Sequence, residues 1–194
     1  MSEAESSPEQ WEHEHSEQLA DYEIFRVRRE RLRSPRDGTS HDFYIVDSED
    51  GVTVIALTPD DEMVLVEQVR HPLGRVTLET PSGFIDEGEE AIEAGLRELR
   101  EETGYLAEDP ELIGRLVINP SWQNTEVSVV LVRNARREAE KELDAGEDTR
   151  VHTVPVEEVR SMLMDGRIFS SSIVAALGLY FLGNGRSDTT TAGR

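Results

Sequence analysis

Apolar residues recur along the chain in two patterns that predict strands. Ile24–Leu32 alternates apolar with mostly basic residues, as a half-buried strand does, and His41–Val46 follows a Pro-Arg-Asp-Gly turn as its returning partner. Val52–Leu57 is an apolar run, with Thr53 as its one polar residue, that forms a predicted hairpin with Met63–Val69. Further strands are predicted at Arg75–Glu79, Leu112–Val117, Val127–Val132 and Arg150–Val154.

Helical patterns follow the first group of strands and close the chain. The first predicted helix has Glu89 and Glu90 in its first turn, where the helix dipole favours anions, and it ends before Gly104. Two more helices are predicted at about Val156–Met164 and Ser171–Leu182. Hairpins mixed with crossover connections predict the α+β class, as an α/β/α sandwich with a mixed sheet, preceded by a small antiparallel strand region.

The two ends of the chain are polar and differ from the middle. Residues 1–20 are rich in Ser, Glu and Gln, which predicts a disordered or loosely helical arm, and residues 184–194 have the composition of a frayed tail. The intervening chain divides into a strand region at 21–48 and the main domain at 49–183. His13, Glu14 and His15 could bind a metal ion, although solvated side chains are the favoured interpretation in such an arm.

Composition narrows the class of protein. The chain has 194 residues, 37% of them hydrophobic, and it has no cysteine, so disulfides, thiolate metal sites and a thiol nucleophile are excluded. The apolar run Ile173–Leu182 is shorter than the roughly 20 residues of a membrane-spanning helix. The acidic N-terminus has no apolar segment typical of a secretory signal. We therefore expect a cytoplasmic protein with no membrane partner.

Charge limits the partners of the protein. Twenty basic residues face 41 acidic ones, which gives a formal net charge of −21. Such a chain repels phosphate backbones, so we expect no nucleic-acid partner. A phosphorylated substrate would need cations at the site, and a metal ion is the obvious candidate. Adaptation of solubility to a salty cytoplasm is an alternative explanation of the acidic excess.

Carboxylates gather on one face of the first predicted helix. Glu98, Glu101 and Glu102 project from neighbouring positions, and Arg97 lies four residues before Glu101 and can pair with it. Glu98 and Glu102 are then left aimed at the same point. Two carboxylates completed by water and phosphate oxygens are a usual way to hold Mg²⁺. If only these acidic residues are considered, a solvated acidic helix face without metal binding is the alternative interpretation.

The surrounding stretch resembles the Nudix box, Gly-x5-Glu-x7-Arg-Glu-U-x-Glu-Glu-x-Gly-U, in which U is aliphatic. The match extends over Gly83, Glu89, Arg97, Glu98, Leu99, Glu101, Glu102 and Gly104. Tyr105 in the last aliphatic place is a mild departure. The resemblance implies a Nudix-like fold and hydrolysis of nucleoside diphosphates linked to another moiety.

The resemblance also implies roles for individual residues. Glu98 and Glu102 would ligate Mg²⁺ or Mn²⁺, with the Ser82 carbonyl as a possible further ligand. Arg97 would hold Glu101 by an ion pair. Water would attack one phosphorus of a pyrophosphate, with the negative charge of the phosphates neutralised by the metal.

Beyond the box, the chain resembles the ADP-ribose pyrophosphatase subgroup. Pro120 lies sixteen residues after Gly104, as a proline of that subgroup does, and Arg70 occupies a position that binds substrate phosphates there. Asp144–His152 resembles an acidic loop that supplies a catalytic glutamate. Glu147 is the implied general base, with Glu101 as its rival, because Ala145 replaces another glutamate of that loop.

Aromatic side chains are candidates for stacking on the substrate's adenine by residue type only. Trp122 is kept as a candidate for substrate binding, whereas Phe25 and Tyr44 are assigned to packing. Members of the subgroup are commonly homodimers with crossed N-terminal strands, which here would be residues 24–46.

The implied activity is hydrolysis of ADP-ribose, a small nucleotide sugar, to AMP and ribose 5-phosphate. GDP-mannose or another nucleoside diphosphate derivative is an alternative substrate. A non-catalytic domain that senses ADP-ribose is a further alternative. It is opposed by the retained carboxylates and by the lack of a basic helix-turn-helix segment.

Overall fold

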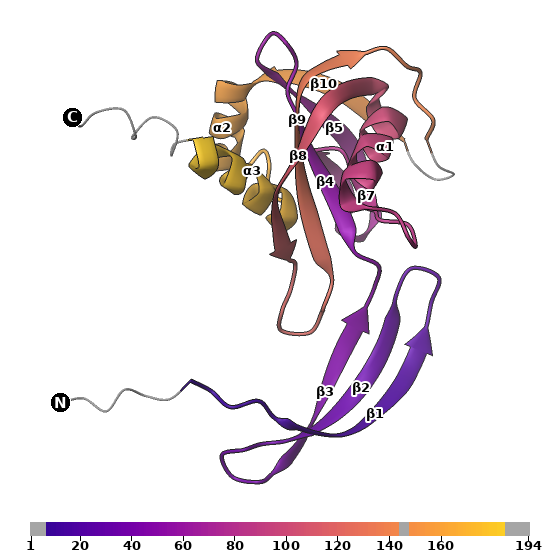
Figure 1. Ribbon diagram of the computed structural model, residues 1–194, viewed down its shortest axis with the longest axis vertical. Helices are drawn as coiled ribbons and strands as arrows, with labels where there is room; N and C mark the ends of the chain where they lie inside the picture. Colours follow the sequence, from indigo (N-terminus) through magenta and orange to yellow (C-terminus); the bar gives the residue numbers. More distant parts are fainter. Residues whose placement is uncertain (1–6, 144–147, 185–194) are drawn as a thin grey trace, which may run out of the picture. The chain divides into compact units, whose positions relative to one another are not determined.

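The structure is a computed structural model that describes residues 7–143 and 148–184. The chain divides into two compact units (Figure 1). The N-terminal unit comprises Met1–Glu49 and Asn119–Thr125, and the second unit comprises Asp50–Ile118 and Glu126–Arg194.

An antiparallel sheet forms the N-terminal unit. Its strands are β1 (Glu12–Asp21), β2 (Arg26–Arg33) and β3 (Ser40–Asp47), in the order β1-β2-β3. The sequence-based interpretation of residues 12–20 as a disordered or loosely helical arm is therefore wrong. The segment lacks apolar residues for a core, but it forms a strand because the backbone of β2 pairs with it and arginines of β2 neutralise its glutamates.

The two faces of this sheet differ in chemistry. On one, which we call the charged face, arginines of β2 form ion pairs with acids of both neighbouring strands, among them Arg29–Glu17, Arg33–Glu14 and Arg31–Asp42. The other, which we call the aromatic face, carries Phe43, His41, Leu32 and Ile45, together with the ion pairs of Arg28 with Glu30 and Asp47. Trp11 lies against it, with its ring centroid 5.4 Å from that of Phe43 and 5.5 Å from that of His41.

The second unit contains the mixed sheet that the sequence predicts. One sheet has the order β7-β4-β9-β8, with β4 and β9 parallel and the other neighbours antiparallel, and a second has the antiparallel order β10-β5-β6. The strands are β4 (Gly51–Ala56), β5 (Glu62–Arg70), β6 (Arg75–Glu79), β7 (Ser82–Phe84), β8 (Tyr105–Val117), β9 (Glu126–Arg137) and β10 (Thr149–Pro155). The helices are α1 (Ala91–Thr103), α2 (Val156–Asp165) and α3 (Ser171–Asn184), with a 3₁₀ turn at His71–Leu73.

Both faces of β4 are buried, which explains why its sequence is apolar except for Thr53, whose hydroxyl lies 2.6 Å from that of Thr80. Val52, Val54 and Ala56 pack in one cluster with Ala94 and Leu99 of α1. The alternate residues Ile55 and Leu57 pack in a second cluster with buried side chains of α2 and α3. Helices therefore cover both faces of the sheet, and the predicted α/β/α sandwich is confirmed (Figure 1).

Some elements differ from the sequence prediction in extent. The strand predicted at Leu112–Val117 begins at Tyr105, and the three-residue strand β7 was not predicted. Helix α3 is apolar on most sides, and it buries Ile173 and Leu177 but leaves Leu182 exposed. Within the described residues, no helix combines the length and the apolar character needed to cross a bilayer.

The packing of α1 on the sheet yields a stability prediction. Leu99 is fully buried. We expect Leu99→Ala to lower the free energy of unfolding by about 2–5 kcal/mol, because the substitution leaves a cavity between α1 and the sheet. Urea denaturation measures this value. The matched control Leu182→Ala, at a residue that is 77% exposed, should change it by less than about 0.5 kcal/mol.

Candidate active site

Helix α1 is fixed at both ends by its own sequence. Glu93 accepts a hydrogen bond from the backbone N–H of Glu90, the residue that precedes the helix. At the other end Gly104 adopts φ of 75° and donates its N–H to the Arg100 carbonyl. A side chain at Gly104 would also overlap the Ala139 carbonyl. Glycine is therefore required at this stop both by the backbone conformation and by the close approach.

Arg97 is the centre of a carboxylate cluster. It forms ion pairs with Glu89 (2.9 Å), Glu98 (2.8 Å) and Glu101 (3.2 Å), and Nη2 also donates to the Phe84 carbonyl at 2.9 Å. The ion pair between Arg97 and Glu101 that the sequence predicts is therefore present. One guanidinium compensates three carboxylates that would otherwise repel each other.

Glu89 has a different place from the one that the sequence suggested. The helix begins at Ala91, so Glu89 precedes it. Its two carboxylate oxygens accept hydrogen bonds from Arg97 Nε and Nη2, at 3.0 and 2.9 Å. The hydrogen bonds from Arg97 hold the pKa of Glu89 below its usual value, and they hold the pKa of Arg97 above its own. Glu89 thus remains charged and orients Arg97 from the loop side.

The carboxylates of Glu98 and Glu102 both lie against the strand β7. Glu102 is 2% exposed, and its Oε2 accepts a hydrogen bond from the backbone N–H of Ser82 at 3.1 Å. Glu98 lies against Gly83, where any Cβ would overlap its carboxylate. β7 is held in place by pairing with β4. The two side chains therefore both contact one short stretch of backbone, residues 82 and 83.

This donor set fits a hard divalent cation. The converging groups are two carboxylates, and the absence of a side chain at Gly83 leaves room for the carboxylate of Glu98 against the backbone of β7. Among the described residues no group of three or more His, Asp or Glu side chains is already gathered as a complete metal site. Further ligands would come from water, substrate and backbone.

Arg70 ends β5 and is tied to a buried acid that the sequence analysis did not single out. Arg70 Nε and Nη2 donate to the two carboxylate oxygens of Glu79, at 3.1 and 2.6 Å. Glu79 is 4% exposed. Burial alone would raise the pKa of Glu79, but hydrogen bonds from Arg70 and Thr77 and the charge of Arg70 outweigh it and lower that pKa. The pair fixes the direction of the Arg70 guanidinium.

The other sequence candidates lie outside the second unit or outside the described chain. Pro120 and Trp122 belong to Asn119–Thr125 in the N-terminal unit, where the Trp122 carbonyl accepts the Val46 N–H at 2.8 Å. Glu147 lies outside the described residues. The roles of these residues remain predictions.

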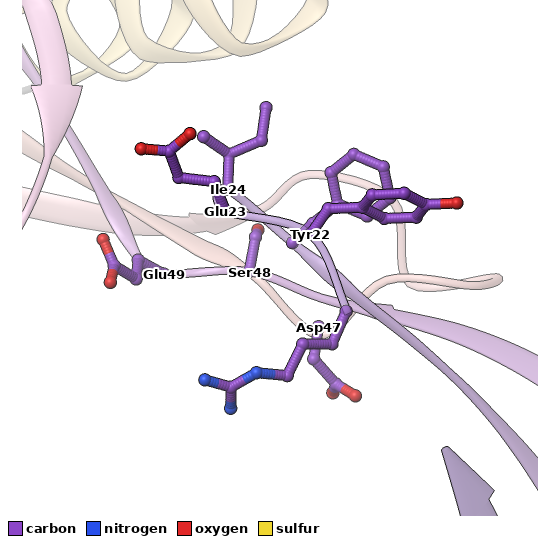
Figure 2. Close-up of a pocket in the computed structure, with 8 residues that line it drawn as sticks. Tyr22, Glu23, Ile24, Asp47, Ser48 and Glu49 are labelled. Carbon is purple, nitrogen blue, oxygen red and sulfur yellow. The ribbon is translucent and has the colours of Figure 1, made fainter. Parts of the chain in front are cut away.

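The N-terminal unit contains a small hollow of its own (Figure 2). It has a volume of about 180 Å³ and lies between the turn after β1 and the end of β3. It is lined by Tyr22 and Phe25, whose ring centroids lie 5.1 Å apart, and by Asp47 and Ser48. Ligand pockets usually measure about 300–1,000 Å³, so this hollow alone is too small for a nucleotide sugar.

Comparison with known proteins gives a consistent family. A model described as the NUDIX domain matches residues 47–177. The ADP-ribose pyrophosphatase of Bacillus subtilis is 31% identical over 134 residues, which cover 69% of this chain and 72% of that protein. The ADP-ribose pyrophosphatase of Mycobacterium tuberculosis is 29% identical over 164 residues, which cover 84% of this chain and 79% of that protein.

Two further similarities extend over most of the chain. The methanol dehydrogenase activator of Bacillus methanolicus is 28% identical over 163 residues, covering 84% of this chain and 88% of that protein. A crystal structure of an ADP compounds hydrolase superposes with a TM-score of 0.84 at 22% identity, covering 94% of this chain and 98% of that one. The latter shows a shared fold.

The ion pair of Arg70 with Glu79 predicts a pH-dependent stability. The pKa of Glu79 is lower in the folded protein than in the unfolded chain, where it is about 4.3. The ionised carboxylate therefore contributes fully to the free energy of unfolding above that unfolded pKa, and the contribution is lost as pH falls through the folded pKa. Arg70→Met leaves the buried carboxylate uncompensated. We expect it to lower the free energy of unfolding at neutral pH, by an amount that shrinks below about pH 4.

Urea denaturation at several pH values measures this difference. Arg36→Met is the control, because the Arg36 side chain is 88% exposed, and loss of its surface ion pair with Asp37 should change the free energy of unfolding by less than about 1 kcal/mol at any pH. A loss for Arg70→Met that is the same at all pH values would mean that packing of the side chain, not its charge, stabilises this corner.

Proposed function

The chain belongs to the Nudix family, and on that basis we propose that it hydrolyses the pyrophosphate bond of ADP-ribose or a related nucleoside diphosphate sugar. With ADP-ribose, water adds to one phosphorus, the bridging P–O bond breaks, and AMP and ribose 5-phosphate leave. The observation that carries the proposal is the similarity to the Bacillus subtilis ADP-ribose pyrophosphatase in a chain that retains Glu98, Glu101 and Glu102.

Glu98 and Glu102 are the proposed ligands of Mg²⁺ or Mn²⁺, with the Ser82 carbonyl as a further ligand. Their convergence on residues 82 and 83 supports this assignment. When bound there, the cation would neutralise phosphate oxygens and lower the pKa of the attacking water. The cation would also attract an anionic substrate to a protein whose net charge is −21.

The general base is proposed to be Glu147, with Glu101 as the rival. Glu101 accepts from both Arg97 and Arg100, at 3.2 and 3.4 Å. The two arginines contact different carboxylate oxygens of Glu101, so neither oxygen is left for the attacking water alone. This restraint is the physical reason to place Glu147 first.

Substrate binding is assigned to Arg70, Pro120 and Trp122. Arg70 would contact the phosphates, and its orientation by Glu79 supports this role because a prealigned guanidinium loses little freedom when it binds an anion. Trp122 is 47% exposed, which is compatible with stacking on a base.

Other functions remain as candidates within the same fold. GDP-mannose or another nucleoside diphosphate derivative could replace ADP-ribose, and a non-catalytic sensor would bind ADP-ribose without turnover. Activation of a dehydrogenase is a further candidate because the match to the methanol dehydrogenase activator covers 84% of the chain. A substrate panel with Mg²⁺ and Mn²⁺ separates the hydrolases, and the rate of a methanol dehydrogenase with and without this protein tests activation.

The proposal predicts the products and the effect of removing a metal ligand. ADP-ribose with Mg²⁺ should yield AMP and ribose 5-phosphate, detected by chromatography. Glu102→Gln should keep the fold, since the amide oxygen can still accept the Ser82 N–H, and should lower kcat by several orders of magnitude. Activity within tenfold of wild type would contradict the metal assignment.

Glu93→Gln is the matched control, because it makes the same change of charge at an exposed position of α1 and should leave kcat nearly unchanged. The same assay distinguishes the two bases. The replacement of the true base by Gln should lower kcat with little change in KM, and the loss should shrink as pH rises because hydroxide needs no base.

We further propose that the protein acts in the cytoplasm as a homodimer that buries the aromatic face of the N-terminal sheet. The ring of Trp11 contacts the rings of Phe43 and His41 there, and Phe43 remains 39% exposed. An exposed aromatic surface of this kind is typical of interfaces.

A charge placed on that face should therefore dissociate the dimer. Wild type should be a dimer at micromolar concentration by light scattering, and Phe43→Asp should be a monomer. The control is Tyr44→Asp, because Tyr44 is the next residue of β3 and projects from the opposite face. A monomeric wild type, or equal effects of the two substitutions, would contradict this interface.

A further inference from the structure

The last turn of α1 is completed by residues far along the chain. A helix leaves its last four carbonyls without partners inside the helix. Here the Glu101 carbonyl accepts the backbone N–H of Glu142 at 3.0 Å, and the Glu102 carbonyl accepts the hydroxyl of Thr149 at 3.3 Å. Both residues whose carbonyls are capped in this way carry carboxylates of the candidate site.

Lys141 reinforces the second of these contacts. It is the only lysine in a chain whose other cationic side chains are arginines. Its Nζ donates to the Thr149 carbonyl at 2.7 Å and lies 3.5 Å from the Thr149 hydroxyl. A hydroxyl can accept from the ammonium while it donates to the Glu102 carbonyl. A positive charge beside the end of a helix is also favoured by the helix dipole.

Thr149 connects α1 to the strand that ends at Arg70. Thr149 is 3% exposed and is the first residue of β10, where it pairs with Gln68 of β5. Ser82 thus contacts Glu102 at its carboxylate, and Thr149 contacts it at its carbonyl. Removal of the second contact would take a hydrogen bond from a carbonyl in the last turn of the helix, which favours fraying there.

We propose that Lys141 and Thr149 are positioning residues that fix the last turn of α1 and thereby hold the Glu102 carboxylate where a divalent cation binds. The inference rests on the proposed function only for the role of that cation. A purely structural role would stabilise the fold without changing how tightly the folded protein binds a metal.

The test measures Mn²⁺ binding to the substrate-free protein by electron paramagnetic resonance. Thr149→Val keeps the shape of the side chain but removes the hydroxyl, so we expect the dissociation constant of Mn²⁺ to rise about tenfold, the equivalent of one hydrogen bond. Thr149→Ser restores the hydroxyl and should bind Mn²⁺ as wild type does. Lys141→Met, at a half-buried position, should weaken binding in the same direction.

Thr58→Val is the matched control. Its hydroxyl accepts hydrogen bonds from the backbone N–H groups of Asp60 and Glu62, at 3.3 and 3.2 Å. Thr58 follows the C-terminal end of β4, whereas β7 pairs with the N-terminal half of that strand. We expect this variant to lower the urea midpoint while Mn²⁺ affinity stays unchanged. Mn²⁺ affinity that is equal to wild type in both Thr149→Val and Lys141→Met would overturn the proposal, and so would equal losses in Thr58→Val.

The outcome is separable from the proposed function. If wild type hydrolyses none of the nucleotide sugars but Thr149→Val still weakens Mn²⁺ binding, the positioning role stands and the substrate assignment fails. If ADP-ribose is hydrolysed and neither Thr149→Val nor Lys141→Met changes Mn²⁺ affinity, the positioning role alone fails.

Discussion

The interaction on which the candidate site depends is the pairing of one guanidinium with three carboxylates. Like charges on neighbouring helical positions repel, and the repulsion grows as water is excluded. Arg97 makes the arrangement possible by contacting Glu89, Glu98 and Glu101 together. Its further bond to the Phe84 carbonyl ties this charge cluster to β7. The helix and the strand that share the proposed metal site are therefore fixed relative to each other by the same residue.

In the N-terminal sheet, acidic side chains are compensated by ion pairs between neighbouring strands. In the N-terminal sheet, glutamates of β1 and an aspartate of β3 flank arginines of β2, so neighbouring strands attract each other through their side chains. Single exposed ion pairs contribute only about 0–1 kcal/mol each, but a network across adjacent strands acts together with the backbone pairing. This unit can therefore hold three strands together with few buried apolar residues.

The second unit shows how a site is built on rigid elements. α1 is packed on the sheet through Ala94 and Leu99, and its last turn is bound by Glu142 and Thr149. The carboxylates thus emerge from a helix that is fixed on its inner face and at its C-terminal end. Such restraint matters for metal-assisted chemistry, because ligands have to be held within about 0.5 Å of the productive geometry.

The sequence by itself determined the class of fold, the stop of α1 at Gly104 and the placing of Glu98, Glu101 and Glu102 on one face of α1. These features depend on local periodicity, on a glycine at a positive φ and on fixed spacing along one helix. All three follow from residues that are close together in the sequence. The alternation of β4 between two apolar clusters likewise follows from a short apolar run that is buried on both faces.

Tertiary structure alone decided which distant residues meet. β1 forms because arginines of β2 pair with its glutamates. Glu79 can be charged and buried because Arg70 reaches it from the neighbouring strand β5. Thr149 caps a helix that ended 46 residues earlier. Polar residues in such pairs are not revealed by hydrophobic periodicity. In the sequence, each of them looks like an ordinary residue of the solvated surface. Their roles depend on a partner whose position only the folded chain specifies, because a buried charge or carbonyl is tolerated only where its partner is supplied.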